Sequence, residues 1–190
     1  MADRFSRAHW IHWAAAALIL LAVVNQLAWL SQATAVETWD DDAGLFRFAT
    51  CLEDQLRGGD AACLSGAPYP PLIPAIAAAH FLISGARGVD MALLRLWPWT
   101  VLLGVSLWAG TRRAAGEWAG LAAVALGPVI VWSLHIRGKF YTEVPLAALS
   151  LAAIVAWVHS EGFRRRRPAL ALGLFIGLGL LAKWSFAFFL

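Results

Sequence analysis

Apolar runs of nearly membrane-spanning length recur along this chain, and they limit what it can fold into more than any other feature. They cover residues 14–30, 91–110, 114–133, 144–159 and 169–182. A helix needs about 20 apolar residues to cross the hydrocarbon core of a bilayer. Only 14% of the 190 residues are charged, whereas about 25% is usual in a soluble domain. The sequence therefore predicts an all-α fold, a polytopic transmembrane helical bundle.

The basic residues cluster at the ends of the apolar runs. Arg4 and Arg7 precede the first run, Arg112 and Arg113 follow another, and Arg164–Arg167 form a block between two more. The net charge of +3 therefore reflects membrane topology, and we expect no nucleic-acid partner. Because basic residues favour the cytoplasmic side of a membrane, the N-terminus is predicted to be cytoplasmic. The first run is too long for the core of a signal peptide, so we interpret it as an uncleaved helix.

Between residues 31 and 69 the chain is polar and acidic. This segment holds seven of the twelve acidic residues, including the consecutive Asp40, Asp41 and Asp42. Apolar residues recur within 44–56 in a partly amphipathic pattern, which predicts a short helix along the membrane surface. Cys51 and Cys63, the two cysteines of the chain, lie in this segment. We predict that they form a disulfide, since a loop outside the cytoplasm permits oxidation.

The charge pattern also predicts the number of crossings. An odd number of spans must connect the outer acidic segment with the cytoplasmic Arg112-Arg113 pair, yet both 70–84 and 91–111 are apolar. The 70–84 run is short and carries Pro71 and Pro74, so we predict a juxtamembrane or re-entrant helix there. One transmembrane domain, 1–190, then has spans at about 12–30, 91–111, 114–133, 144–160 and 169–183, and an outer segment at 31–90.

This topology gathers charged and polar residues of separate segments on one membrane face. They are Asp40, Asp41, Asp42, Tyr69, Arg137, Lys139, Glu143 and Lys183. Taken singly, each has an ordinary explanation, as a solvated loop residue or an interface anchor. Together, carboxylates and cations on one face suggest a site for an anionic lipid-linked substrate, with cations on a phosphate leaving group and a carboxylate as proton acceptor.

Four short motifs follow one another along the chain. They are an acidic pair, a Pro-Pro-Leu, an acid shortly before a Pro, and a Gly-rich helix ending in a basic residue: Asp41-Asp42, Pro70-Pro71-Leu72, Glu143-Val144-Pro145 and Gly173 to Lys183. In this order they resemble the motifs of the GT-C superfamily of glycosyltransferases that use polyprenyl-phosphate sugars. The resemblance is greatest to family 39, the relatives of protein O-mannosyltransferases and of lipid A aminoarabinose transferases.

The resemblance implies a metal-independent, cofactor-free, inverting transfer at the outer face of the cytoplasmic (inner) membrane. The donor would be a polyprenyl-phosphate sugar, and the acceptor an unidentified hydroxyl on a protein, lipid or glycan. Asp41 would be the general base, while Asp42 and Glu143 would orient reacting groups. Substrate contacts would come from Asp40, Tyr69, Arg137, Lys139 and Lys183, with Lys183 on the phosphate.

Within the acidic motif, Leu45 stands where Tyr is common in the family. The chain departs from the family pattern in two further respects. Tyr69 stands where Lys often precedes Pro-Pro, which leaves one phosphate contact unassigned. Members of the family are several hundred residues long, so the resemblance covers about the first third of one. The alternatives are a non-catalytic membrane protein, such as a transporter subunit or scaffold, and an inactive truncated transferase.

Overall fold

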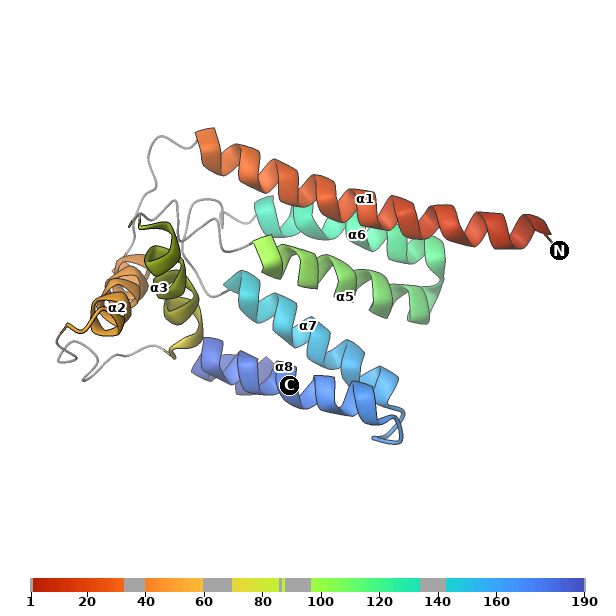
Figure 1. The fold of residues 1–190 in the computed structure, drawn as a ribbon. Coiled ribbons are helices and arrows are strands. Elements are labelled where there is room, and N and C mark those ends of the chain that lie inside the picture. Colours follow the sequence, from red (N-terminus) through yellow and green to blue (C-terminus); the bar gives the residue numbers. More distant parts are fainter. Residues whose placement is uncertain are drawn as a thin grey trace.

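The protein is a bundle of lengthwise helices with two shorter helices lying across one of its ends (Figure 1). A computed structural model describes residues 2–32, 40–59, 70–85, 87, 97–133 and 143–189. Within these ranges all regular elements are helical. They are α1 (Ala2–Gln32), α2 (Asp40–Leu56), α3 (Leu72–Ser84), α5 (Trp97–Ala115), α6 (Glu117–Ser133), α7 (Glu143–Ser160), α8 (Arg166–Ala182) and the 3-10 helix η3 (Trp184–Phe189).

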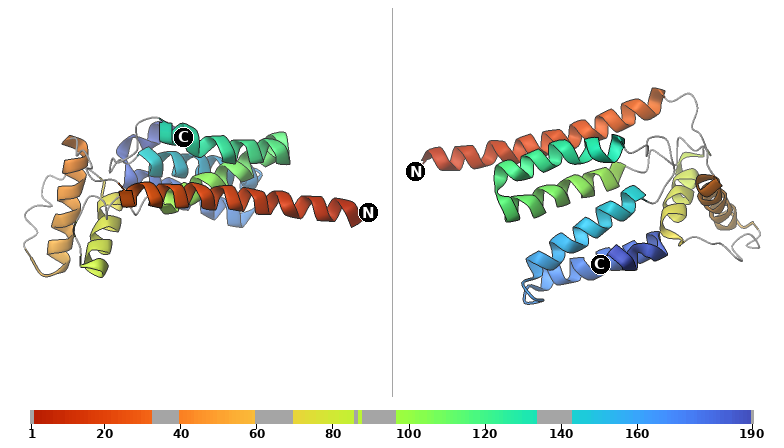
Figure 2. Two further views of the ribbon diagram at one scale, coloured as in Figure 1. Left: turned by 90° about the horizontal axis from the view of Figure 1, so that it is seen from above. Right: turned by 180° about the vertical axis from the view of Figure 1, so that it is seen from behind.

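The lengthwise helices α1, α5, α6, α7 and α8 alternate in direction along the chain (Figure 1). Helix α7 packs between α8 and α5, while α1 packs on both α5 and α6. Helices α2 and α3 pack side by side and run across the direction of the others (Figure 2). The pair α2–α3 is called the platform below. Because the lengthwise helices alternate in direction, the end of α1, the start of α7 and the end of α8 all lie near the platform (Figure 1).

The bundle exposes many large apolar side chains on its surface. On α1, Leu20, Leu21 and Val24 are exposed, and on α8 Leu170 and Leu174 are exposed one turn apart. Within the described residues, the segments Trp10–Ala28 and Glu143–Ser160 are long and apolar enough to cross a membrane, and Leu72–Ser84 and Glu117–Gly127 are shorter apolar helices. Exposed apolar side chains on helices of this length are typical of helices that face lipid. The predicted all-α membrane fold is confirmed.

Close approach between α1 and α5 depends on one small residue and one buried polar contact. A Cβ added to Gly104 would lie 2.8 Å from the Ile19 side chain, so any larger residue here would require Ile19 or the two helices to shift. One turn earlier on α5, the Thr100 hydroxyl donates to Gln26 Oε1 at 2.8 Å, and this bond is buried. Small residues and interhelical hydrogen bonds are the usual means of helix association in lipid.

Two helix boundaries differ from the predicted ones. Helix α5 continues through Arg112 and Arg113 to Ala115, and Gly116, at φ +91°, separates it from α6. Helix α2 begins at Asp40 rather than Gly44, because carboxylates in a first helical turn are favoured by the positive end of the helix dipole. Residues 91–96, predicted to open a span, lie outside the described residues.

The end of the bundle opposite the platform is basic. Arg113, in the last turn of α5, lies 4.0 Å from Glu161, which also pairs with Arg165 at 2.8 Å. Glu161 lies in the turn between α7 and α8. Arg112-Arg113 and Arg164–Arg167 therefore lie at one end of the bundle, and the platform occupies the other (Figure 1).

Candidate functional site

An ion pair joins the start of α7 to the end of α8 at the platform end of the bundle. Lys183 Nζ donates to Glu143 Oε1 at 2.8 Å, and each side chain is 40% exposed. The other carboxylate oxygen, Glu143 Oε2, is buried and has no hydrogen-bond partner. A buried oxygen of an ionised carboxylate normally has a donor, so Oε2 is an acceptor that the described protein residues leave unsatisfied.

The backbone holds both members of this pair at helix ends that suit their charges. Glu143 is the first residue of α7, where the helix dipole is positive, and Lys183 caps the end of α8, where it is negative. Lys183 has extended backbone angles, and its N–H donates to Gly179 O at 2.9 Å. The chain then turns into η3, whose Phe186 N–H donates back to Lys183 O. Lys183 is therefore fixed at a corner between two helices.

A hydrophobic cluster beneath the pair connects it to the platform. Leu146, one turn after Glu143, and Ala182, directly before Lys183, both belong to this cluster. Its other buried members come from α2, α3, α7 and η3: Leu45, Ala49, Ile73, Ala77, Phe81, Leu149 and Phe186. Because these side chains pack as one group, the platform is held against the ends of α7 and α8 where the ion pair lies.

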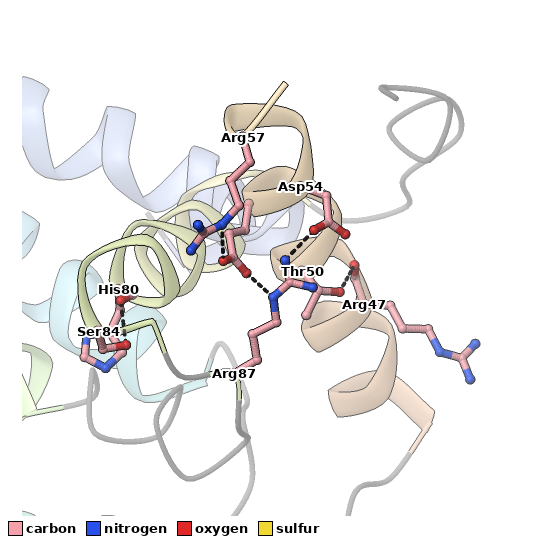
Figure 3. A network of polar contacts seen from close by, with 8 residues as sticks. Arg47, Thr50, Asp54, Arg57, His80, Ser84 and Arg87 are labelled. Atoms are coloured by element: carbon pink, nitrogen blue, oxygen red, sulfur yellow. Dashed lines mark hydrogen bonds and ion pairs between the residues drawn. The ribbon is translucent and has the colours of Figure 1, made fainter. Parts of the chain in front are cut away.

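A second polar network, which the sequence analysis did not predict, joins α2 to the chain after α3 (Figure 3). Glu53 on α2 is 1% exposed. Its Oε1 accepts from Arg57 Nε at 2.8 Å, and its Oε2 lies 2.6 Å from Arg87 Nε. Arg87, which follows α3, also donates to Asp54. That hydrogen bond raises the pKa of the Arg87 guanidinium.

The spacing of residues along α2 is enough to predict one contact of this network, the pair of Glu53 and Arg57. Arg57 stands four residues after Glu53, a spacing that pairs charges on one helix face. Arg87 has no such signal, because it reaches Glu53 only after α3 has packed against α2. His80 on α3 is a further residue without a sequence signal. Its Nε2 is buried and lacks a hydrogen-bond partner, and Figure 3 shows its ring on the side of α3 away from α2.

The predicted site residues divide into those that the structure places and those that it does not. Glu143 and Lys183 are brought into direct contact. Asp40, Asp41 and Asp42 form the first turn of α2 in the platform, but their side chains lie outside the described ones. Tyr69, Arg137 and Lys139 lie outside the described residues altogether. The predicted gathering of Asp41 with Glu143 and Lys183 in one site therefore stays a prediction.

The structure describes one of the two cysteines of the predicted disulfide. Cys51 on α2 is disulfide-bonded. The sequence has one other cysteine, Cys63, which lies outside the described residues. The pairing of Cys51 with Cys63 therefore stays a prediction. Helix α2 is also held by the contacts of Arg87 with Glu53 and Asp54.

Comparison with known proteins identifies the family of the chain. Residues 68–190 match the model of the dolichyl-phosphate-mannose-protein mannosyltransferase family. The chain belongs to this family. The matched region begins just before Pro70-Pro71-Leu72 and includes both Glu143 and Lys183. The resemblance to family 39 of the GT-C superfamily is thereby confirmed.

Curated relatives of a different description also match part of the chain. A triacylglyceride transporter of Mycobacterium tuberculosis (strain ATCC 25618 / H37Rv) is 34% identical over 113 residues, covering 53% of this chain and 22% of the relative. A probable triacylglyceride transporter of Mycobacterium bovis (strain BCG / Pasteur 1173P2) matches to the same extent. The chain thus spans about a fifth of the length of these relatives. No solved structure matches.

Proposed function

We propose that this chain carries the acceptor-side carboxylates and a phosphate-binding lysine of a membrane glycosyltransferase. The enzyme would transfer a sugar from a polyprenyl-phosphate donor to the hydroxyl of a protein, lipid or glycan at the outer face of the cytoplasmic membrane. The observation that carries the proposal is the Glu143–Lys183 pair, which lies inside the family match and beside an amphipathic platform. Membership of the family supports the donor class.

The residues at the platform end suit the bonds that such a transfer makes and breaks. A carboxylate, for which Asp41 is the best candidate, accepts the proton of the acceptor hydroxyl. The hydroxyl oxygen forms a bond to the anomeric carbon, and the bond from that carbon to the phosphate oxygen breaks. The polyprenyl phosphate leaves with the electron pair, and Lys183 stabilises its negative charge. Asp42 and Glu143 orient the reacting groups.

Other polar residues complete the proposed site. Arg137 and Lys139 would add positive charge around the donor phosphate, and Asp40 and Tyr69 would contact the sugar or the acceptor. The polyprenyl tail would lie along the exposed apolar faces of the bundle. In this arrangement α1, α5, α6, α7 and α8 cross the membrane, the N-terminus is cytoplasmic, and the platform lies at the outer surface.

Transfer of radiolabelled sugar from polyprenyl phosphate to endogenous acceptors, by membranes containing the protein, tests this proposal. Asp41→Asn keeps the size of the side chain but removes the proton acceptor, so transfer should fall about 100-fold or more. Asp40→Asn and Asp42→Asn test the neighbouring carboxylates, whose proposed roles predict smaller losses of transfer. Normal transfer by Asp41→Asn, with either of these two variants inactive, would assign the base to another carboxylate. Full transfer by all three variants would refute a catalytic role for this turn.

Transport of an apolar lipid is the second candidate function. The specific observation in its favour is the 34% identity with triacylglyceride transporters. Moving labelled triacylglyceride between the leaflets of proteoliposomes would measure this activity directly. Transport without any sugar transfer would favour this candidate over the transferase.

A further inference from the structure

The end of the bundle opposite the platform carries an excess of positive charge that the proposed transfer does not use. Among the side chains that the structure describes there, six arginines stand against two glutamates: Arg112, Arg113, Arg164, Arg165, Arg166, Arg167, Glu117 and Glu161. All six arginines are exposed, and Arg113 and Arg165 share Glu161 as a partner. An excess of cations at a membrane surface attracts anionic lipid headgroups.

Arg112 is held in place by side chains that are not acidic. Its Nη1 lies 2.6 Å from Nε2 of His12 on α1. Since a guanidinium group can only donate, His12 is the acceptor of this bond. The guanidinium also lies over the Trp108 ring, 5.6 Å from the ring centroid. Neither contact removes the positive charge, so Arg112 is a fixed cation without a carboxylate partner among the described residues.

The Trp108 ring is itself held from two sides, by α1 and by α6. The His12 ring meets it edge-on, with the two centroids 5.6 Å apart. On α6, a Cβ added to Gly120 would lie 2.9 Å from Cε3 of Trp108 and 3.2 Å from Cβ of Arg112. Alanine at position 120 would therefore force Trp108 to shift. Three packed helices, α1, α5 and α6, thus build the surroundings of Arg112.

Exposed tryptophans of the same helices suit the boundary between lipid headgroups and hydrocarbon. Trp10 on α1 and Trp118 on α6 are exposed, and their ring centroids lie 5.5 Å apart. Tryptophan is enriched at this boundary because its ring is apolar while its N–H is polar. Farther along α1, Leu20 and Leu21 are exposed, and they offer apolar surface to acyl chains.

We propose that Arg112, held by His12 and Trp108, binds the phosphate group of an anionic phospholipid. A guanidinium group has five N–H donors, and those that His12 does not use donate to the phosphate oxygens in charge-assisted bonds. The neighbouring arginines draw anionic lipid to this end of the bundle. The inference requires that the bundle crosses a membrane, but it does not depend on sugar transfer.

Native mass spectrometry of the purified protein in detergent tests this site. The protein is equilibrated with equal amounts of phosphatidylglycerol and phosphatidylcholine of the same acyl chains, and the retained lipid is identified. The wild type should prefer phosphatidylglycerol, because the choline cation of the other lipid offsets its phosphate charge. Arg112→Gln should lower this preference about fivefold, the effect of one basic side chain near anionic lipid. Arg112→Lys should lower it less, since lysine keeps the charge but loses the planar set of donors and the stacking on Trp108.

Arg47→Gln is the matched control, because Arg47 is an exposed arginine on α2, at the platform end. It removes the same charge from the opposite end of the bundle, so its lipid preference should equal that of the wild type. An equal loss in Arg47→Gln and Arg112→Gln would show a general effect of net charge and would overturn the site. Unchanged preference in Arg112→Gln, or equal retention of both lipids by the wild type, would overturn it as well.

A soluble headgroup distinguishes a lipid site from a site for a free phosphate ester. A large excess of glycerophosphoglycerol, which is the headgroup of phosphatidylglycerol without its acyl chains, should leave the retained lipid in place. The reason is that the acyl chains add contacts with the apolar surface of the bundle. Complete displacement of the lipid by glycerophosphoglycerol would refute a phospholipid as the occupant.

Discussion

Among the described residues, Glu53 is the charged side chain with the least exposure, at 1%. A carboxylate removed from water is costly unless cations and donors surround it. Arg57, on α2 itself, supplies a cation and a hydrogen bond, and Arg87, after α3, supplies a second cation. The network therefore decides how α3 and the chain that follows it are held against α2.

Replacing Glu53 with glutamine should destabilise the platform. The amide lacks the negative charge and points N–H donors at Arg57 or Arg87, so we expect the free energy of unfolding to fall by about 2 kcal/mol. Thermal unfolding of the purified protein, followed by tryptophan fluorescence, measures the change. Asp54→Asn is the control, because Asp54 is 52% exposed and solvent screens its pairing with Arg87. A loss of stability as large in Asp54→Asn would contradict a special role for the buried carboxylate.

At the scale of the element, the corner between α8 and η3 is built around one glycine. A Cβ on Gly179 would lie 2.3 Å from Phe186 Cζ. Phe186 is fully buried in the cluster beneath the ion pair, so its ring cannot swing into solvent. Gly173 and Gly177, on the same helix, have no atom within 4 Å of an added Cβ. The glycines of α8 therefore differ in their surroundings. Gly179 is packed against Phe186, whereas Gly173 and Gly177 have room for a side chain.

Gly179→Ala should lower stability by about 1–3 kcal/mol, as overpacking in a filled core does. Displacement of Phe186 would also move Lys183, so affinity for polyprenyl phosphate should fall in the same variant. Gly177→Ala is the control, and it should be neutral or stabilising by up to about 1 kcal/mol, because alanine is the better helix former. Thermal unfolding measures the change in stability, and binding of polyprenyl phosphate by the purified protein in lipid nanodiscs measures the change in affinity. Equal behaviour of the two variants would contradict the assigned contact.

At the scale of the whole molecule, the charges of the two bundle ends predict the orientation in the membrane. The end with Arg112, Arg113 and Arg164–Arg167 should face the cytoplasm under the positive-inside rule, and the platform should face outward. Figure 2 shows that the platform lies at one end of the bundle. One labelled residue at each end is therefore enough to determine the orientation of the bundle in the membrane.

Cysteine labelling of intact cells tests this orientation. In a Cys51→Ser/Cys63→Ser background, Gln55→Cys places a thiol on the exposed part of α2, and Arg164→Cys places one in the exposed basic turn. A membrane-impermeant maleimide should label Gln55→Cys in intact cells, but should label Arg164→Cys only after the membrane is permeabilised. Labelling of both in intact cells, or the reverse order, would show that the topology is wrong.

Short sequence motifs predicted which residues belong to the candidate site but did not predict the contacts between them. Glu143 and Lys183 were each singled out from short motifs forty residues apart, and the topology placed them on one face. Their direct pairing was not predicted, because an ion pair depends on how α7 and α8 pack and on where α8 ends. The Arg87 contacts of Glu53 and Asp54 are a stronger example, since no motif or periodicity connects these residues.

The sequence by itself determined the class of this protein. Apolar runs of spanning length, with basic residues at their ends, have one stable solution in a bilayer, which is a bundle of helices that satisfy their own backbone hydrogen bonds. The order of motifs likewise indicated the family. Only the tertiary structure decided which charges neutralise one another. Partners such as Glu143–Lys183 and Glu53–Arg87 meet because separate helices pack on a shared hydrophobic cluster, and that packing is a property of the whole bundle.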